Sequence, residues 1–337
     1  MKVYDASVNL NKIRYDLSSI EHSFSKLSNQ QILDKRWKNT DKALRMALPY
    51  IRRYYRQIAD QVISLLKQID FSYDKLNKPV TKTVRRIVED KIEEYQEKGL
   101  VTGFFKYLIS TNKWTYRSIL EILLIGIYAE KFIQIKQVSY DVFTIAAVDV
   151  YSQSIADRKL KNYVLLSSAA IMAMAVMPVV GNTYDEYIES LIVTQAQETE
   201  NYILVNAIQV ITIDDGMLLE KIIKQANHIL KINRDKYSGI VDDLSRSIGN
   251  DAYTYGTKKE DDLKIRFVAE MDNRTTRMCQ SLNNQIFYVN KENTFRRYSA
   301  SHKNYIEVTV NGLVQGVNLP PISDHFHWCR STITYQI

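Results

Sequence analysis

The sequence predicts a mainly α-helical protein with a small α+β module at its C-terminal end. Glycine and proline are both scarce, with 10 and 5 residues in a chain of 337, so few positions interrupt helices. Apolar residues recur with a helical spacing through the first two-thirds of the chain, whereas after about residue 260 they alternate as in strands. We therefore expect an elongated helical N-terminal part, followed by a Cys/His module that contains a β-hairpin.

The first region, 1–110, is expected to be basic and helical. Its clearest helix is predicted at about 81–98, where apolar residues fall on one face between Pro79 and Gly99, residue types that start and stop helices. Pro49 is expected to break or kink an earlier amphipathic stretch, because proline cannot donate the backbone hydrogen bond of a helix interior.

The second region, 111–234, is more apolar. Helices are predicted around 118–132 and 217–232, the latter after the breaker sequence Asp-Asp-Gly at 214–216. The uncharged run at 163–181 falls just short of the roughly 20 residues that a membrane-spanning helix needs. Alanine and serine lower its hydropathy, so we favour a helix buried on all sides by other helices over a membrane segment.

The third region, 235–337, is predicted to contain the β structure. Residues 285–289 have the composition of a strand, and 305–310 alternate apolar with polar side chains. Asn311 and Gly312 then precede a further short apolar stretch, and this pair favours the tight turn of a hairpin.

The net charge of +7 lies entirely near the N-terminus, since residues 1–56 hold 12 Lys and Arg against 5 Asp and Glu. Such an excess predicts an acidic partner, either nucleic acid or an acidic protein surface. Two segments, 35–38 and 52–56, mix cations with aromatic residues as phosphate-tracking surfaces do. The candidate nucleic-acid-binding residues are Lys35, Arg36, Lys38, Arg52, Arg53 and Arg56. A solvated helix face would have the same composition, and no motif that reads base sequence is present.

Both cysteines and three of the five histidines lie in the last 59 residues. If 325–329 is extended, His325, His327 and Cys329 share one face, and with Cys279 they could surround Zn²⁺ tetrahedrally. The paired short Cys spacings of recognisable zinc sites are missing. Two packed thiols, one disulfide and a catalytic Cys–His pair are therefore alternatives, and His302 is expected to be a solvated loop residue.

A combination of residues in the same region resembles a known family. The pattern is Asp-x-x-Thr-x-x-x-Cys, then a leucine and a short strand, then Pro-Pro and a closing His and Cys-Arg-Ser. It consists of Asp272, Arg274, Thr275, Thr276, Cys279, Leu282, Pro320, Pro321, His325 or His327, Cys329, Arg330 and Ser331. It resembles the C-terminal module of phage head-morphogenesis proteins, the minor head proteins of the phage Mu protein F type, over roughly residues 235–337.

The resemblance implies a low-copy structural protein of the virion, in the capsid interior near the portal, that takes part in head morphogenesis and in DNA packaging or ejection. Portal and capsid proteins and double-stranded DNA would be its partners, zinc its one candidate cofactor, and the host cytoplasm its place of synthesis. No catalytic residues are expected, because no Gly-rich phosphate loop, nucleophile elbow or His-Glu-x-x-His helix is present. Two other classes stay open: a metal-dependent hydrolase or toxin-like effector, based on the His-x-His pair, and a membrane-active ejection protein, based on 163–181.

Overall fold

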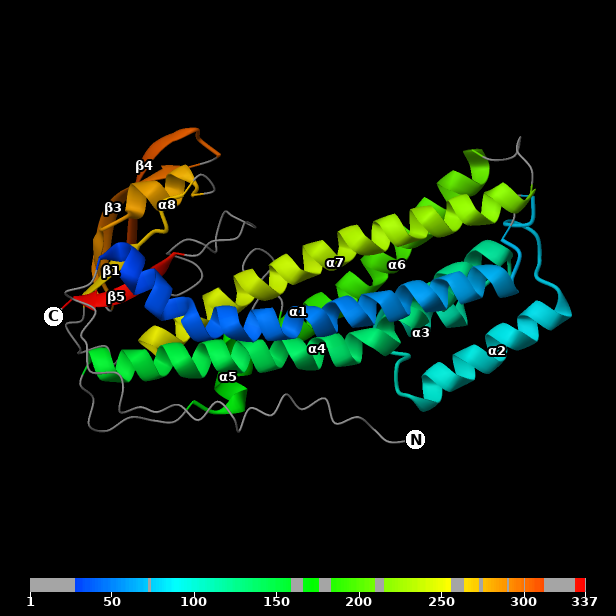
Figure 1. Cartoon of the computed structure of the whole chain (residues 1–337), viewed down its shortest axis with the longest axis horizontal. Helices are drawn as coiled ribbons and strands as arrows, with labels where there is room; N and C mark the ends of the chain where they lie inside the picture. The colour runs from blue at the N-terminus through cyan, green and yellow to red at the C-terminus, as the bar shows by residue number, and fades with distance from the viewer. Residues whose placement is uncertain are drawn as a thin grey trace. The chain divides into compact units, whose positions relative to one another are not determined.

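The computed structural model describes residues 28–71, 74–158, 166–175, 183–209, 215–255, 264–272, 275–289, 291–299, 301–311 and 331–336. This part of the chain is mainly helical, with small antiparallel sheets near the C-terminus (Figure 1). The helices are α1 (Asn29–Gln68), α2 (Lys82–Glu97), α3 (Gly103–Ser110), α4 (Tyr116–Asp157), α5 (Ser168–Met174), α6 (Tyr184–Gln209), α7 (Asp215–Thr254) and α8 (Arg277–Leu282). The strands are β1 (Lys264–Val268), β2 (Ile286–Tyr288), β3 (Glu292–Ser299), β4 (Asn304–Asn311) and β5 (Thr332–Gln336).

The chain divides into two compact units. The module unit comprises residues up to 46, 139–183 and 240 onward, and the helical unit comprises 47–138 and 184–239. The boundaries fall inside α1, α4 and α7, so these three helices contribute residues to both units. The predicted division into 1–110, 111–234 and 235–337 follows the chain in order, whereas the units of the structure combine segments that are distant in sequence.

Aromatic side chains form the centre of the helical unit. The ring of Phe132 lies 6.1 Å from that of Tyr55 and 5.4 Å from that of Tyr237, both with edge-to-face geometry. The buried hydroxyl of Tyr55 donates a hydrogen bond of 2.9 Å to Oε1 of Gln195, and the hydroxyls of Tyr184 and Tyr237 bond to each other. The phenols of Tyr55, Tyr184 and Tyr237 therefore have polar partners, as the low-dielectric interior requires.

Helix α2 has the ends that the sequence predicts. The side chain of Thr81 accepts a hydrogen bond from the backbone amide of Val84 at the N-terminus. At the C-terminus Gly99 has a positive φ of 69°, and the amides of Gly99 and Leu100 donate to the carbonyls of Gln96 and Tyr95. This is the Schellman arrangement, which needs a residue free to adopt the left-handed region, so the predicted helix at 81–98 is confirmed.

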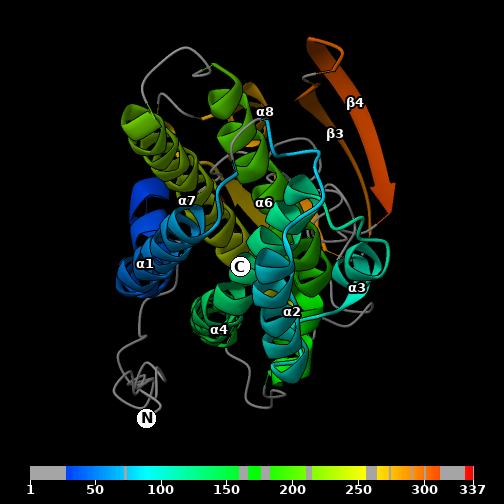
Figure 2. The same cartoon turned by 90° about the vertical axis from the view of Figure 1, so that its right-hand side faces the viewer.

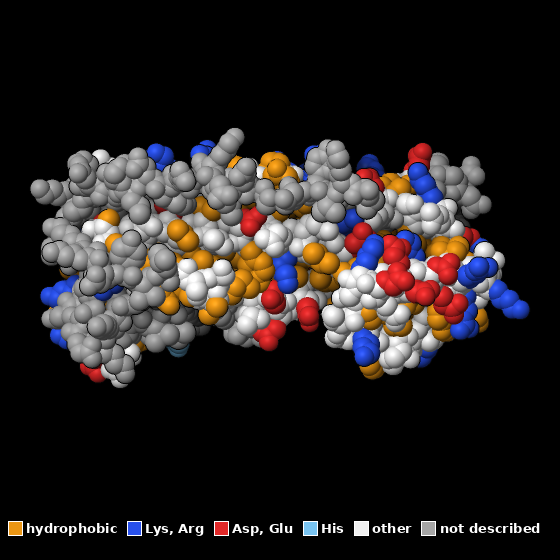
Figure 3. Space-filling model, turned by 90° about the horizontal axis from the view of Figure 1, so that it is seen from below, with side chains coloured by type: hydrophobic (Ala, Val, Ile, Leu, Met, Phe, Trp, Pro, Cys, Tyr) orange, Lys and Arg blue, Asp and Glu red, His pale blue; other side chains and the backbone are white. Residues whose placement is uncertain are grey.

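A close helix crossing attaches α2 to α4. A Cβ added at Gly126 of α4 would lie 2.0 Å from the ring of Tyr95, so the tyrosine occupies the space that a side chain would fill. Tyr95 and Ile92 are buried on this side, whereas charged side chains of both signs intermingle over α2, which faces the viewer at the right of Figure 3.

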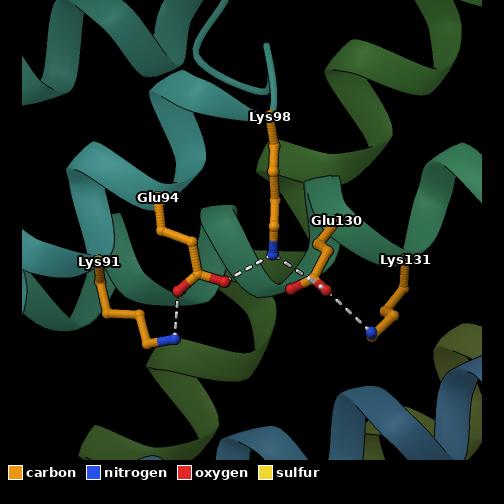
Figure 4. A network of polar contacts seen from close by, with 5 residues as sticks. All are labelled: Lys91, Glu94, Lys98, Glu130 and Lys131. Carbon is orange, nitrogen blue, oxygen red and sulfur yellow. Dashed lines mark hydrogen bonds and ion pairs between the residues drawn. The ribbon is translucent and has the colours of Figure 1, made fainter. Parts of the chain in front are cut away.

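A chain of ion pairs extends across the same crossing (Figure 4). Glu94 accepts from Lys91 and Lys98, each at 2.6 Å, and these hydrogen bonds lower its pKa to about 2. Lys98 also lies 3.6 Å from Glu130 of α4, which pairs with Lys131 at 3.1 Å. Since these groups are partly exposed, we expect them to set the orientation of α2 more than its stability.

The module unit is built around β1. The sheet order is β2-β1-β5, with both neighbours antiparallel to β1, and β3 and β4 form a separate antiparallel pair. Its core joins Trp37 of α1 and Tyr253 of α7 to apolar residues of β1, α8 and β3. The predicted strands at 285–289 and 305–310 are confirmed as β2 and β4, but β4 pairs with β3. The stretch after the predicted Asn311–Gly312 turn lies outside the described residues.

A buried stack of side chains connects the helices of the module unit to β5. The guanidinium of Arg36 lies 3.9 Å from the ring centre of Tyr253, which stacks on Tyr335 of β5 at 4.7 Å. The Tyr253 hydroxyl donates to Asp157 at 2.6 Å and accepts from the backbone amide of Tyr335 at 3.0 Å. Arg36 itself donates to the carbonyl oxygen of Ile333 at 3.0 Å. Residues from α1, α4, α7 and β5 thus meet at one point.

Two sequence expectations need correction. Helix α1 runs through Pro49 without ending there, so the predicted break is wrong. Within 163–181 the described helix, α5, is only 7 residues long; Ser168 and Ala173 are exposed and Ile171 is its buried residue. The described part of this run is therefore not a helix buried on all sides, because small residues leave little apolar area to bury. Among the described helices, none is long and apolar enough to cross a membrane.

Gly126→Ala should destabilise the protein, although alanine normally favours a helix interior over glycine by about 1 kcal/mol. The added methyl group would overlap the Tyr95 ring, and such overpacking costs roughly 1–3 kcal/mol. Urea denaturation of the variant would measure this loss, and Tyr95→Leu in the same background should recover part of it. A stability equal to or above that of the wild type would show that α2 is not closely packed on α4.

Glu200 should make the stability of the helical unit depend on pH. Burial and the neighbouring Glu121 raise its pKa to about 7, although Arg117 lies 3.5 Å away and favours the charged form. A raised carboxyl pKa means that the folded state binds the proton more tightly than the unfolded state does. The stability of the protein therefore falls as the pH rises from the ordinary pKa of a glutamate through about 7. The advantage of Glu200→Gln over the wild type should grow between about pH 5 and about pH 8 by on the order of 2 kcal/mol. The exposed Glu93→Gln variant is the control, and equal pH profiles for all three proteins would refute the shift.

Candidate functional site

The basic residues predicted to contact nucleic acid all lie on α1, and the structure separates exposed from buried ones. Arg52, Arg53 and Arg56 are exposed in the helical unit. Among the residues that the structure describes, no carboxylate forms an ion pair with any of these three guanidiniums. Arg52 and Arg56 are one helical turn apart and so share a face. They form a cluster with several hydrogen-bond donors directed to solvent.

The aromatic residues of this segment do not provide a stacking surface for bases. Tyr54 and Tyr55 are buried, and Tyr55 belongs to the aromatic centre of the helical unit. The guanidinium of Arg53 lies 5.3 Å from the Tyr54 ring and 5.6 Å from the partly exposed ring of Tyr50. The tyrosines therefore hold the cation over the helix surface, which suits contact with phosphate rather than with unstacked bases.

Residues 35–38 of the module unit divide in a different way. Lys38 is exposed, Lys35 is half-buried, and Arg36 is fully buried against Tyr253. Arg36 consequently serves the interior of the module unit and has no access to a phosphate. Lys42 and Arg45, which the prediction did not include, are exposed four and seven residues after Lys38, on the same face of α1.

Of the four predicted zinc ligands, the structure describes Cys279. Cys279 lies on α8 with 3% of its surface exposed, among apolar residues of the module core that include Phe267 and Leu282. His325, His327 and Cys329 lie outside the described residues. Within the described ranges, no three His, Cys, Asp or Glu side chains are grouped as metal ligands would be. The zinc site stays a prediction.

Cys279 is positioned by the family-like motif around it. The side chain of Thr276 accepts from the amide of Cys279 at 3.3 Å and so caps α8. The hydroxyl of Thr275 accepts from the Asp272 amide at 2.8 Å, and the Thr275 amide donates to the Asp272 carbonyl at 3.1 Å. Asp272, Thr275 and Thr276 therefore build the turn that leads into α8.

The other motif residues are only partly described. Ser331 is buried, and its carbonyl oxygen accepts from the side-chain amide of Asn250 at 3.2 Å. Arg274, Pro320, Pro321 and Arg330 lie outside the described residues. His302 is described: its Nδ1 lies 3.0 Å from the hydroxyl of Ser299, in the turn between β3 and β4.

Comparison with known proteins adds no assignment: no protein family matches the chain, and no curated protein or solved structure is significantly similar to it.

Arg36→Met should destabilise the protein strongly, by roughly 3–5 kcal/mol, because it leaves buried polar groups without their charged partner. Lys38→Met, two residues away and exposed, should change stability by no more than about 0.5 kcal/mol. Chemical denaturation of both variants measures the difference. Similar small effects would mean that Arg36 does not connect α1 to β5.

Proposed function

We propose that this chain is a minor head protein of a phage capsid, a low-copy structural component near the portal that contacts packaged DNA. The proposal combines the family-like motif at 272–331 with the exposed basic clusters of α1. It assigns the module unit to docking on portal or capsid proteins, and it assigns no catalytic role to the chain. The virion would be its location, and zinc would be a structural cofactor of the module if it is bound.

The proposal that the chain contacts DNA rests on the exposure and the charge of Arg52, Arg53 and Arg56. They are exposed, they form no ion pair within the described residues, and they stand on a long helix. Phosphate binding by such residues releases counterions from DNA and does not distinguish base sequences. Contact with packaged DNA of any sequence is what a protein of the capsid interior would need.

Arg52→Gln combined with Arg56→Gln should weaken binding of a short labelled DNA duplex at least several-fold. The slope of log affinity against log salt concentration should become shallower by about 2, because two phosphate contacts are lost. Fluorescence anisotropy at several salt concentrations measures both quantities, and a duplex of unrelated sequence should bind equally well.

The matched control removes two exposed cations that are also one turn apart, Lys82→Gln with Arg86→Gln on α2. If this control weakens DNA binding as much as the α1 variant, only net charge matters and the proposed interface is refuted. Co-sedimentation of the chain with portal assemblies would test the docking role separately.

A further inference from the structure

The helical unit contains a cavity of about 460 Å³ between α3, α4 and α6. Figure 2 shows α3 beside α6. Pockets that bind ligands or anchoring side chains have volumes of roughly 300–1,000 Å³, so this cavity could hold one or two large side chains. It lies apart from the Arg52, Arg53 and Arg56 cluster, none of which lines it.

The cavity has an apolar floor and an acidic mouth. Leu100, Phe105 and Ile125 line it and are themselves buried. Glu186 and Glu189, one turn apart on α6, also line it and are exposed. No lysine or arginine is among its described lining residues. An apolar group that enters the floor therefore passes two carboxylates of the same charge.

Helix α3 exposes aromatic residues next to this mouth. Phe104 lines the cavity and keeps 43% of its surface exposed, and Tyr107 is 60% exposed. The two rings lie 6.1 Å apart. Of the five apolar side chains between 104 and 109, only Phe105 is buried. Exposed aromatic rings beside an apolar pocket are typical of protein-interaction sites.

The charge around the mouth selects the occupant. Asp185, next to Glu186, forms an ion pair of 2.9 Å with Lys136. The charged residues among the described lining of the cavity are Glu186 and Glu189, so the lining itself is acidic. Arginine and lysine are attracted both to carboxylates and to the faces of aromatic rings. An acidic or purely apolar segment would gain nothing from Glu186 and Glu189.

We propose that this cavity, the α3–α6 pocket, is a docking site for a peptide segment of a partner protein in which a large apolar side chain is flanked by arginine or lysine. The apolar side chain enters the floor at Leu100, Phe105 and Ile125. The flanking cations meet the carboxylates of Glu186 and Glu189 and the ring of Phe104. The site is independent of the proposed contact with DNA.

Two blocked tetrapeptides with the same leucine–tryptophan centre test this proposal, one flanked by arginine on both sides and one by glutamate. The full-length chain should bind the arginine peptide about 10-fold more tightly than the glutamate peptide, because only the former complements the mouth. Titration calorimetry at low salt measures both affinities. Equal affinities, or no detectable binding of the arginine peptide, would refute the proposal.

Variants locate the binding. Glu186→Gln with Glu189→Gln should weaken the arginine peptide about 10-fold, whereas Glu93→Gln with Glu97→Gln, the same charge change on the exposed face of α2, should not. Ser190→Trp, which places a bulky ring at the exposed wall of the cavity, should abolish binding. Thr194→Trp blocks the same wall and replaces this variant if Ser190→Trp fails to fold. Binding that survives both tryptophan variants, or that the α2 control weakens equally, would place the peptide elsewhere.

Discussion

The module unit depends on the buried guanidinium of Arg36. A cation without access to water is tolerated only where other groups replace its hydration. Here the ring face of Tyr253, the carbonyl oxygen of Ile333 and the charge of Asp149 do so, and they come from α7, β5 and α4. Because each partner belongs to a different element, the side chain fixes the register of all of them at once. Apolar residues would hold the same elements together but would allow them to slide.

The helical unit is held together in another way. Its centre is a group of tyrosine and phenylalanine rings. The tyrosine hydroxyls form hydrogen bonds with one another or with glutamine and threonine side chains. Tyrosine suits these positions, since a phenol fills space and also satisfies a buried polar partner. The α3–α6 pocket is lined by residues of α3, α4 and α6 in this unit, and α3 is only 8 residues long.

Local signals in the sequence predicted local structure well. Helix α2 was predictable because Pro79 and Gly99 bound it and its apolar stripe is regular. Strands β1 and β5 were not, since each is only five residues long and is defined by pairing across many intervening residues. A break at Pro49 was one of the two outcomes expected there, and α1 instead continues through this residue. Packing of both flanking segments can outweigh the one hydrogen bond that proline removes.

The candidate site also depends on tertiary contacts that local sequence patterns do not predict. Composition could locate the basic segments but not the rotation of α1, which buries Arg36 and leaves Lys38 in solvent. A rotation of about 100° per residue decides this, and it is set by tertiary contacts. The α3–α6 pocket had no signal at all in the sequence, because its walls come from three separate segments, 100–105, 125–129 and 186–197, with ordinary helical patterns.

The position of β5 has a consequence for how the chain is made. β5 is synthesised last among the described elements, yet it pairs with β1 and bonds to Arg36, 297 residues earlier. During translation α1 therefore emerges long before β5 is synthesised. Until then, apolar surfaces of α1, α7 and β1 in the module unit stay uncovered. Contacts this distant along the chain slow folding, and the uncovered apolar surfaces are prone to aggregation until β5 has emerged and paired. The module unit is therefore completed late in the synthesis of the described part of the chain.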